Sequence, residues 1–475
     1  MKADFSRIPS GRDKSYLRVL YQQGRVQLDA DDVEQAAIIL DYLQQLGRDL
    51  IGRWGGPDPD PGSGELNRGP FAIRGTADTY TTRLPYRLSP GRYYVEGVPC
   101  RLRNALVSSE PGSPLPELPA GKTWLLYLDV WEREVHWIED ESIREVALGG
   151  ADTALRSEIT WRVKRHEVPE TTHRAQVVDR WDVDLLPSWQ PKQRGQLKVR
   201  AGDPPKEPDL CVADPDARYR GLENRFYRVE VHRSGAAGEA TFKWSRDNGS
   251  VVYRLLRLEG ELAFLENLGR DERSGLTVGD WVEIVDDGTE ARSGDLAATK
   301  APRPLYRVEE ILARKIAVRL AVPKDVLEDD PNADLPQYDE EEAAAKHVLV
   351  RRWDHREGDP KQGVPALAGG AAVIEEGSDK DGWLTLEDGI QIQFQPPEVP
   401  NSPNTYRNAD FWWFAARTAT GDVEWPGERN APEARRPVGQ DHHYAPLAVA
   451  AVNANGILTI EDCRRLFPPA AVPVP

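Results

Sequence analysis

KTWLLYLDVWEREVHWI, residues 122–138, decides the fold class of this chain. Trp124, Leu126 and Leu128 lie on one face of an extended chain, and the residues between them lie on the other. This alternation, in a segment rich in aromatic and branched residues, is typical of a β-strand. Together with similar patterns around it, the stretch predicts a β domain over residues 65–168.

Strand patterns separated by turn residues continue along the chain. Asn248-Gly249 lies between two apolar stretches and is the strongest short-range signal for a β-hairpin. After it, residues 276–288, 304–312 and 315–322 resemble the short, curled strands of a small barrel. Further strand patterns lie at 383–394, 410–418, 442–452 and 457–463. The chain is therefore predicted to be mainly β, with sandwich-like and barrel-like domains.

One clear helix is predicted near the N-terminus. Asp31 and Glu34 have the spacing of a capping box, and Gly52 follows the last apolar residue of the pattern. The apolar stripe of this helix consists of Val33, Ala36 or Ala37, Leu40, Leu43, Leu46 and Leu50. Such a stripe packs either on its own domain or on a neighbouring subunit.

The predicted organisation is linear. A helical arm with its linker covers residues 1–64, and the Pro- and Gly-rich stretch at 58–64 is the linker. The remaining segments are a β domain at 65–168, an extended linker at 169–209, a second β domain with a barrel-like insert and an acidic loop at 210–346, and a C-terminal β domain at 347–475.

Composition excludes several classes of protein. The 475 residues carry 61 basic and 78 acidic side chains, a formal net charge of −17, which argues against nucleic acid as a partner. Three distant cysteines signal neither a disulfide framework nor a zinc site. There is no apolar signal-peptide core and no stretch able to span a bilayer, so we expect a soluble protein made in the cytoplasm, without direct membrane insertion.

No motif for catalysis, cofactor binding or metal binding is convincing. The nucleotide-binding, nucleophile-elbow, zinc-protease and EF-hand signatures are absent from the sequence. His442 and His443 beside Asp441 are typical of a turn rather than of a metal site. Asp29, with the neighbouring Asp31 and Asp32, opens a helix, so capping is favoured over calcium binding. We therefore expect no catalytic residue, no cofactor and no metal.

Two alternatives to a non-enzymatic role stay open. A glycoside hydrolase needs two carboxylates, and the candidates are Asp129 with Glu132, Asp286 with Asp287, and Glu387 with Asp388. A carbohydrate-binding or surface-recognition protein would use exposed aromatic residues such as Trp244, Trp412 or Trp413. Strand alternation places Trp412 and Trp413 on opposite faces, so we expect one of them to be exposed at an interface.

The segment YLRVLYQQGRVQLDADDVEQ, residues 16–35, resembles the N-terminal signature of a bacterial family of unknown function, in which the pattern vLxQQGRVxLDADxNEQ recurs. This chain differs from the pattern at Asp32-Val33, where Trp-Asn is expected. Eight later segments are similar to that family in the same order, and they extend to about residue 449: 91–100, 127–135, 143–164, 219–232, 240–252, 383–394, 409–426 and 442–448.

The resemblance implies a structural component of a contractile, phage-tail-like injection system, at or around its baseplate. Its partners would be baseplate, spike or sheath subunits, and a homo-oligomer is compatible with this role. The particle would be cytoplasmic, membrane-anchored or released. We expect residues 16–51 to attach the protein, and the interface residues of this hypothesis are Gln22, Gln23, Gly24, Arg25, Val33, Leu40, Leu43, Leu50, Trp412 and Trp413.

Overall fold

The computed structural model describes residues 2–6, 15–59, 68–75, 81–109, 115–189, 193–202, 218–269, 271, 273–290, 302–356, 365–378 and 382–468. The chain is mainly β, as predicted, and forms two compact units. Unit 1 contains Met1–Ile8, Glu134–Arg156 and Pro191–Gln440, and unit 2 contains Pro9–Arg133, Ser157–Gln190 and Asp441–Pro475. Each unit is thus built from separate segments, whereas the predicted segmentation is linear.

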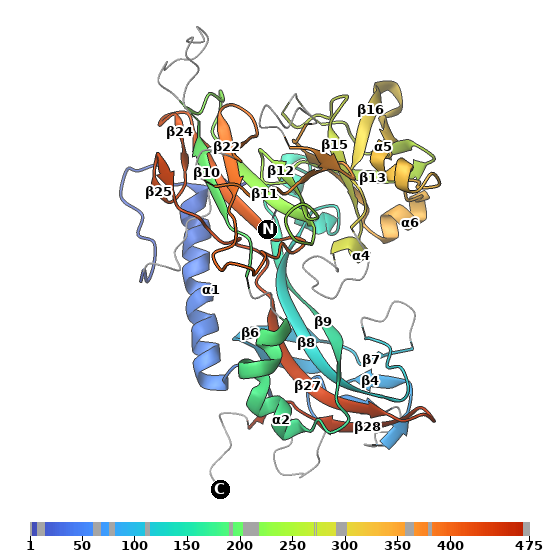
Figure 1. Ribbon diagram of the computed structural model, residues 1–475. Helices are drawn as coiled ribbons and strands as arrows, with labels where there is room; N and C mark the ends of the chain where they lie inside the picture. The colour runs from blue at the N-terminus through green and yellow to red at the C-terminus, as the bar shows by residue number, and fades with distance from the viewer. Residues whose placement is uncertain are drawn as a thin grey trace. The chain divides into compact units, whose positions relative to one another are not determined.

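The largest sheet of unit 2 is built around β8 (Lys122–Val135), the strand predicted from the alternating pattern. β27 (His443–Val452) pairs with it in antiparallel fashion, with Ala450 opposite Trp124. Figure 1 shows these long, curved strands beside β9 (Arg156–Val168) and β28 (Ile457–Asp462). The sheet order is β3-β28-β27-β8-β9, with β3 at Thr81–Arg83.

Two small sheets and several helices complete unit 2. One sheet has the order β29-β1-β5-β6 and the other β2-β4-β7. Their strands are β1 (Trp54–Pro57), β2 (Ile73–Gly75), β4 (Tyr86–Leu88), β5 (Gly91–Val95), β6 (Val98–Leu102), β7 (Leu106–Val107) and β29 (Leu466–Phe467). The helices are α1 (Asp29–Ile51), α2 (Arg174–Arg180), a π-helical turn at Trp181–Leu185 and α3 (Leu186–Trp189).

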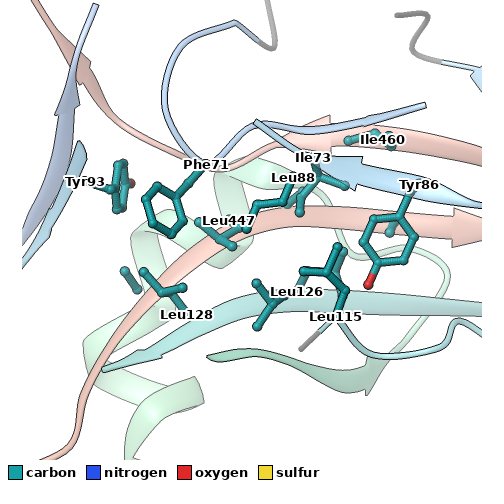
Figure 2. Packing of buried hydrophobic residues seen from close by; sticks show 14 of the residues in the cluster. Phe71, Ile73, Tyr86, Leu88, Tyr93, Leu115, Leu126, Leu128, Leu447 and Ile460 are labelled. Atoms are coloured by element: carbon teal, nitrogen blue, oxygen red, sulfur yellow. The ribbon is translucent and has the colours of Figure 1, made fainter. Parts of the chain in front are cut away.

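The main core of unit 2 lies between the large sheet and these small sheets. Figure 2 shows Leu126 and Leu128 of β8 pointing into it, together with Phe71 and Tyr93. All four side chains are buried. The opposite face of β8 packs Leu125 into a second cluster that holds Val177 of α2. Both faces of the strand are therefore apolar and covered.

Unit 1 contains a β-sandwich. Its six-stranded sheet has the order β19-β20-β12-β11-β23-β24, and a three-stranded sheet, β10-β22-β21, packs on it through a shared apolar core. The strands are β10 (Leu197–Ala201), β11 (Arg225–Arg233), β12 (Thr241–Ser245), β19 (Leu367–Ala368), β20 (Ala371–Val373), β21 (Leu384–Thr385), β22 (Ile390–Phe394), β23 (Phe411–Arg417) and β24 (Asp422–Glu424), with a hairpin of β25 (Gly427–Glu428) and β26 (Ala431–Pro432).

A closed six-stranded barrel, also in unit 1, confirms the barrel prediction. Its strand order is β13-β14-β17-β16-β15-β18, and its interior is an apolar core. The strands are β13 (Val252–Glu259), β14 (Leu262–Leu265), β15 (Trp281–Val285), β16 (Tyr306–Leu312), β17 (Ala317–Ala321) and β18 (Leu349–Trp353). The helices of this region are α4 (Asp287–Glu290), α5 (Lys324–Asp329) and α6 (Glu340–Ala345), and the last two lie in the predicted acidic loop.

The predicted hairpin at Asn248-Gly249 is wrong. Both residues have the positive φ angles of a tight turn, 52° and 68°. However, β12 before the turn belongs to the sandwich and β13 after it belongs to the barrel, so these two strands do not pair. The Asn248 side chain donates to the backbone oxygen of Ala3 at 2.9 Å, which fixes the turn inside unit 1. The turn residues specify that the chain reverses its direction, but they do not specify which strands the flanking segments pair with.

One face of the six-stranded sheet is polar and buried. Arg228, Glu230 and His232 of β11 lie on it, with Lys243 of β12. Lys243 lies 2.7 Å from the carboxylate of Glu283 on barrel strand β15 and 3.3 Å from that of Glu230. Burial alone would raise the pKa of Glu283, but the positive charges of Lys243 and Lys2 lower it to about 2. Ion pairs therefore join the sandwich to the barrel.

Candidate docking surface

The most unusual surface of the described chain is the docking arm, which we define as residues 15–51. It consists of an extended segment, residues 15–28, followed by α1. Of the 24 large hydrophobic side chains that are exposed in the described ranges, twelve lie on this arm. They are Tyr16, Leu17, Leu20, Tyr21, Val26, Leu28, Ile39, Leu40, Tyr42, Leu43, Leu46 and Leu50. Apolar surface of this extent marks an interaction site.

α1 leaves its apolar stripe in solvent. Leu43 is 53% exposed and Leu50 is 76% exposed, and Ala30 is the only residue described as buried within the helix. Leu40 is also exposed, whereas Val33 is half-buried. Packing of this stripe on the rest of unit 2, one of the destinations that the sequence left open, is not found.

The start of α1 differs from the prediction. The helix begins at Asp29 after Leu28, and no side chain caps it by a hydrogen bond, so the predicted capping by Asp31 is wrong. Three aspartates still lie in the first turn, where their charge is favourable for the helix dipole. The side chain of Asp32 instead accepts a hydrogen bond from the Tyr21 hydroxyl of the extended segment. The helix ends at Ile51 before Gly52, as predicted.

A close backbone contact holds the C-terminal half of α1 on unit 2. A side chain added at Gly47 would lie 3.2 Å from the Cα atom of Gly97, in the turn between β5 and β6. The carboxylate of Glu96 in the same turn lies 2.9 Å from Arg48 and 2.6 Å from Arg53. Glycine allows the two backbones to approach, and the shared carboxylate fixes the end of the helix.

Gly97→Ala is expected to destabilise unit 2 by about 1–3 kcal/mol more than a control glycine variant. Gly97 has φ +80°, and its new Cβ atom would lie 2.1 Å from the Gln44 oxygen, so α1 would have to move. Gly121→Ala is the matched control, because Gly121 has φ +75° with nothing within 4 Å. Thermal unfolding of both variants tests this, and equal losses would contradict the role of the contact.

The extended segment is attached to α1 by side chains. The backbone nitrogen of Val19 donates to the Gln35 side chain at 2.8 Å. Gln22 to Arg25 form a turn, in which the Arg25 nitrogen donates to the Gln22 oxygen at 3.3 Å and Gly24 has φ +72°. Gln22, Gln23, Gly24 and Arg25 are all exposed, and the apolar residues on both sides of the turn are exposed as well.

The two adjacent tryptophans of β23 lie in different surroundings. Trp412 is buried in the sandwich core and its indole nitrogen donates to the Arg435 oxygen at 2.8 Å. Trp413 is half-buried on the opposite face, between Phe226 and Phe411. Strand alternation correctly separated the pair, but the prediction that one of them is exposed is wrong, because Trp412 is buried and Trp413 is half-buried.

The predicted turn at His442 and His443 is not found, because strand β27 begins at His443, and the His442 side chain is 2% exposed in a side-chain cluster of unit 2. Its Nδ1 atom lies 2.7 Å from Asp129, whose other carboxylate oxygen lies 2.7 Å from Lys164. Burial alone would raise the pKa of Asp129, but His442 and Lys164 lower it. The Trp131 ring stacks on the imidazole at 5.1 Å. Sequence analysis missed this pairing since the two residues are 313 positions apart.

The carboxylate of Asp286 makes hydrogen bonds and an ion pair with neighbouring side chains. It accepts hydrogen bonds from Thr289 and Tyr338 and lies 3.0 Å from Arg303. Burial alone would raise the pKa of Asp286, but these hydrogen bonds and the Arg303 charge lower it to about 2. A carboxyl group with so low a pKa is a poor general acid at neutral pH. The candidate Glu132 is exposed.

Glu387 has a pKa near neutrality, the range that suits proton transfer. It lies at the turn between β21 and β22, accepts a 2.9 Å hydrogen bond from Tyr227 and lies 2.6 Å from Arg246. Burial raises the pKa of Glu387 to about 7, although Arg246 and Tyr227 lower it. Arg246 also faces Asp354, at 3.7 Å. The raised pKa of Glu387 could not be predicted from the sequence, because the burial of this turn depends on the tertiary structure.

The described ranges contain no group of three or more His, Cys, Asp or Glu side chains that could hold a metal ion. Asp29, Asp31 and Asp32 are therefore not such a group in this structure. Cys100 and Cys463 are buried free thiols, and Cys211 lies outside the described residues. None of the described helices is both long enough and apolar enough to cross a membrane.

Comparison with known proteins gives a family without a function. The family model described as a family of unknown function, DUF6519, matches residues 1–183 and 184–472. No curated protein and no solved structure matches the chain. The functional argument therefore depends on the docking arm and on the sequence itself.

Proposed function

Since the chain belongs to the DUF6519 family of unknown function, we propose from its surface that it is a non-enzymatic structural subunit of a larger assembly, attached through the docking arm. The observation that carries this proposal is the concentration of exposed apolar side chains on residues 15–51. Burying them against another protein removes apolar area from water, at about 25 cal/mol per Å². An arm of this composition is most stable when it is covered.

The extended segment suits the same role. Between Tyr16 and Leu28 the chain adopts no helix or strand of its own, yet it presents tyrosine, leucine and valine side chains to solvent. An extended apolar segment is suited to lie along another protein, where backbone groups and alternate side chains give affinity and specificity. Tyrosine is also enriched at binding hot spots.

The assembly that we propose is a contractile, phage-tail-like particle, with baseplate, spike or sheath subunits as the partners. Support for this finer statement comes from the resemblance of residues 16–35 and eight later segments to proteins encoded with such systems. The protein would be made in the cytoplasm and then built into the particle. The acidic net charge of −17 is unfavourable for nucleic acid or anionic lipid as an alternative partner.

Binding to co-expressed baseplate proteins tests this function. Leu17→Ser combined with Leu20→Ser is expected to reduce the amount of baseplate protein retained in a pull-down by at least about tenfold, because the two leucines are 79% and 68% exposed and would no longer bury apolar area against the partner. The matched control is Leu222→Ser, which removes an isolated leucine that is 92% exposed on unit 1. Equal retention by the arm variant and the control would contradict the proposal.

A further inference from the structure

We infer that the outer face of the β5–β6 hairpin in unit 2 binds an acidic segment of a neighbouring protein subunit, through three arginines that have no partner in their own chain. We call this surface the basic face. It consists of Arg92, Tyr94, Pro99, Arg101 and Arg103. The inference deepens the proposed function and rests on it, since it gives the chemistry that a partner subunit would present to this surface.

Strand alternation separates the two sides of the hairpin. Tyr93 of β5 and Cys100 of β6 point into the main core of unit 2 and are buried. The three arginines of the basic face point away from the core and are exposed. In the antiparallel pairing of the two strands, Arg92 lies opposite Arg101. Residues in this relation have Cβ atoms about 4.5–5.5 Å apart, so two like charges are held side by side.

No carboxylate of the described chain compensates these charges. In the described ranges, the guanidinium groups of Arg92, Arg101 and Arg103 make no hydrogen bond and no ion pair. Glu96, in the turn of the same hairpin, is held by Arg48 and Arg53. Other arginines of unit 2 do pair with carboxylates, as in Arg53–Asp182, Arg68–Asp58, Arg133–Glu158 and Arg180–Asp184.

The like-charge pair is unfavourable for the isolated protein. Arginines directly opposite each other on a sheet repel and destabilise it. The chain as a whole carries a net charge of −17, so carboxylates are abundant, yet none is placed here. A residue choice that breaks a local rule without compensation inside the fold marks a functional surface. An anionic group bound between Arg92 and Arg101 would remove the repulsion.

The neighbouring residues favour protein as the source of that anionic group. Tyr94 lies opposite Pro99 on the same face, and the Tyr94 ring lies 6.5 Å from that of Phe467, which gives apolar contact area beside the charges. Arginine and tyrosine are both enriched at the hot spots of protein interfaces. The fork of a guanidinium group also matches the two oxygens of a carboxylate.

The spacing of the arginines fits an extended acidic segment. Arg101 and Arg103 are two residues apart on an extended chain, which is about 7 Å and equals the spacing of alternate side chains on a partner strand. A nucleic acid or an anionic membrane would approach with many charges, and the net charge of −17 opposes it. A short acidic segment needs only local charge complementarity. We therefore expect acidic residues at alternate positions of the partner.

The basic face is continuous with the docking arm. The hairpin that carries it is the one on which α1 is held, through the close approach of Gly47 to Gly97. From Gly97 to Arg101 the chain advances by four residues, or about 13 Å along β6. A subunit bound to the C-terminal half of α1 would therefore lie next to the basic face.

Binding of co-expressed baseplate proteins to the full chain tests the inference. Arg92→Glu combined with Arg101→Glu is expected to reduce the retained baseplate protein at least about tenfold, because the partner then meets charge of its own sign. Arg307→Glu combined with Arg314→Glu is the matched control, since both arginines are exposed on unit 1 and the net charge changes equally. Equal retention by the two double variants would overturn the inference.

Thermal unfolding separates lost binding from lost folding. Arg92→Glu alone places opposite charges in the cross-strand pair, so it is expected to raise the melting temperature while it lowers the retention of baseplate protein. A melting temperature below that of the wild type would overturn the inference, because the arginines would then serve the fold of unit 2 and not a partner.

Soluble probes identify the class of the partner. A fluorescent peptide with glutamate at every second position is expected to bind the full chain, and to bind the Arg92→Glu, Arg101→Glu variant at least about tenfold more weakly. Oligothymidine of equal charge, and vesicles of phosphatidylcholine and phosphatidylserine in equal parts, are expected not to displace the peptide. Stronger binding of either competitor than of the peptide would overturn the assignment to an acidic protein segment.

The two proposals can fail separately. If the pull-down depends on Leu17 and Leu20 but not on Arg92 and Arg101, the inference fails and the proposed function stands. If it depends on the two arginines but not on the two leucines, attachment through the docking arm fails and binding by the basic face stands.

Discussion

Lowering the pH from 6.5 to 4 is expected to reduce the free energy of unfolding of unit 1, and two buried histidines contribute about 5 kcal/mol to this loss. His232 and His355 are completely buried there. Burial lowers the pKa of His232 to about 3 and that of His355 to about 4, from 6.5. In this range the unfolded chain binds protons that the folded chain does not bind, so stability falls as the pH falls.

The contribution of Glu387 to stability depends on pH in the opposite direction. Burial raises the pKa of Glu387 to about 7, so the folded chain holds a proton there that the unfolded chain loses above pH 4.5. Stability from this group therefore falls as the pH rises between 4.5 and 7. Each fully shifted group contributes a slope of about 1.4 kcal/mol per pH unit. The two histidines together change the free energy of unfolding more steeply with pH than the one glutamate does. The free energy of unfolding from these three groups therefore still increases with pH.

His355→Gln isolates the histidine contribution. Glutamine can keep a donor near the Gly370 oxygen, which lies 2.6 Å from the His355 ring, but it does not titrate. Urea unfolding at several pH values between 4.5 and 6.5 is expected to show a slope about 1.4 kcal/mol per pH unit smaller than that of the wild type. His173→Gln is the control, because the His173 side chain is 70% exposed. An unchanged slope in His355→Gln would refute the assignment.

Lys243→Met is expected to cost about 3–5 kcal/mol, since it leaves two buried carboxylates with one partner fewer. Lys243 lies between Glu230 and Glu283, and all three side chains are at least 85% buried. The Trp353 ring, 4.3 Å away, contacts the same ammonium group. Chemical denaturation at pH 7 measures the loss.

The Lys122–Glu167 pair provides the comparison for this variant. Its atoms lie 2.6 Å apart, but the two side chains are 46% and 54% exposed. Lys122→Met is therefore expected to cost less than about 1 kcal/mol. Adding Glu283→Gln to Lys243→Met should recover part of the loss, because one unpaired buried charge is removed. Equal costs for the two lysine variants would show that the buried ion pairs do not join sandwich and barrel.

Local patterns were sufficient for the clearest elements of this protein, although residues 169–209, predicted to be an extended linker, contain α2, α3 and β10. The helix was expected from Asp31 to about Leu50 and is found at Asp29–Ile51. The strand pattern around Leu126 and the barrel strands were read correctly as well. In each case the information lies within a few neighbouring residues, through the helical or strand period and the turn residues.

Partners across the chain could not be predicted in the same way. The alternation of Arg228, Glu230 and His232 on β11 is typical of a solvent-facing side, yet all three side chains are buried. The Asp129–His442 pair and the pKa of Glu387 also depend on which segments meet. Contacts between distant segments are determined by the tertiary structure, and they cannot be predicted directly from a single sequence.

The pairing of β8 with β27 also constrains the order of folding. Residues 122–130 pair with residues 443–452, which are synthesised about 310 residues later, so the largest sheet of unit 2 cannot close until that later segment has left the ribosome. Until then the apolar faces of β8 have no native neighbour strand on that side, and contacts between segments so distant form slowly. We expect the nascent chain to depend on chaperones over this interval, and C-terminal truncations to aggregate rather than to yield a shorter folded protein.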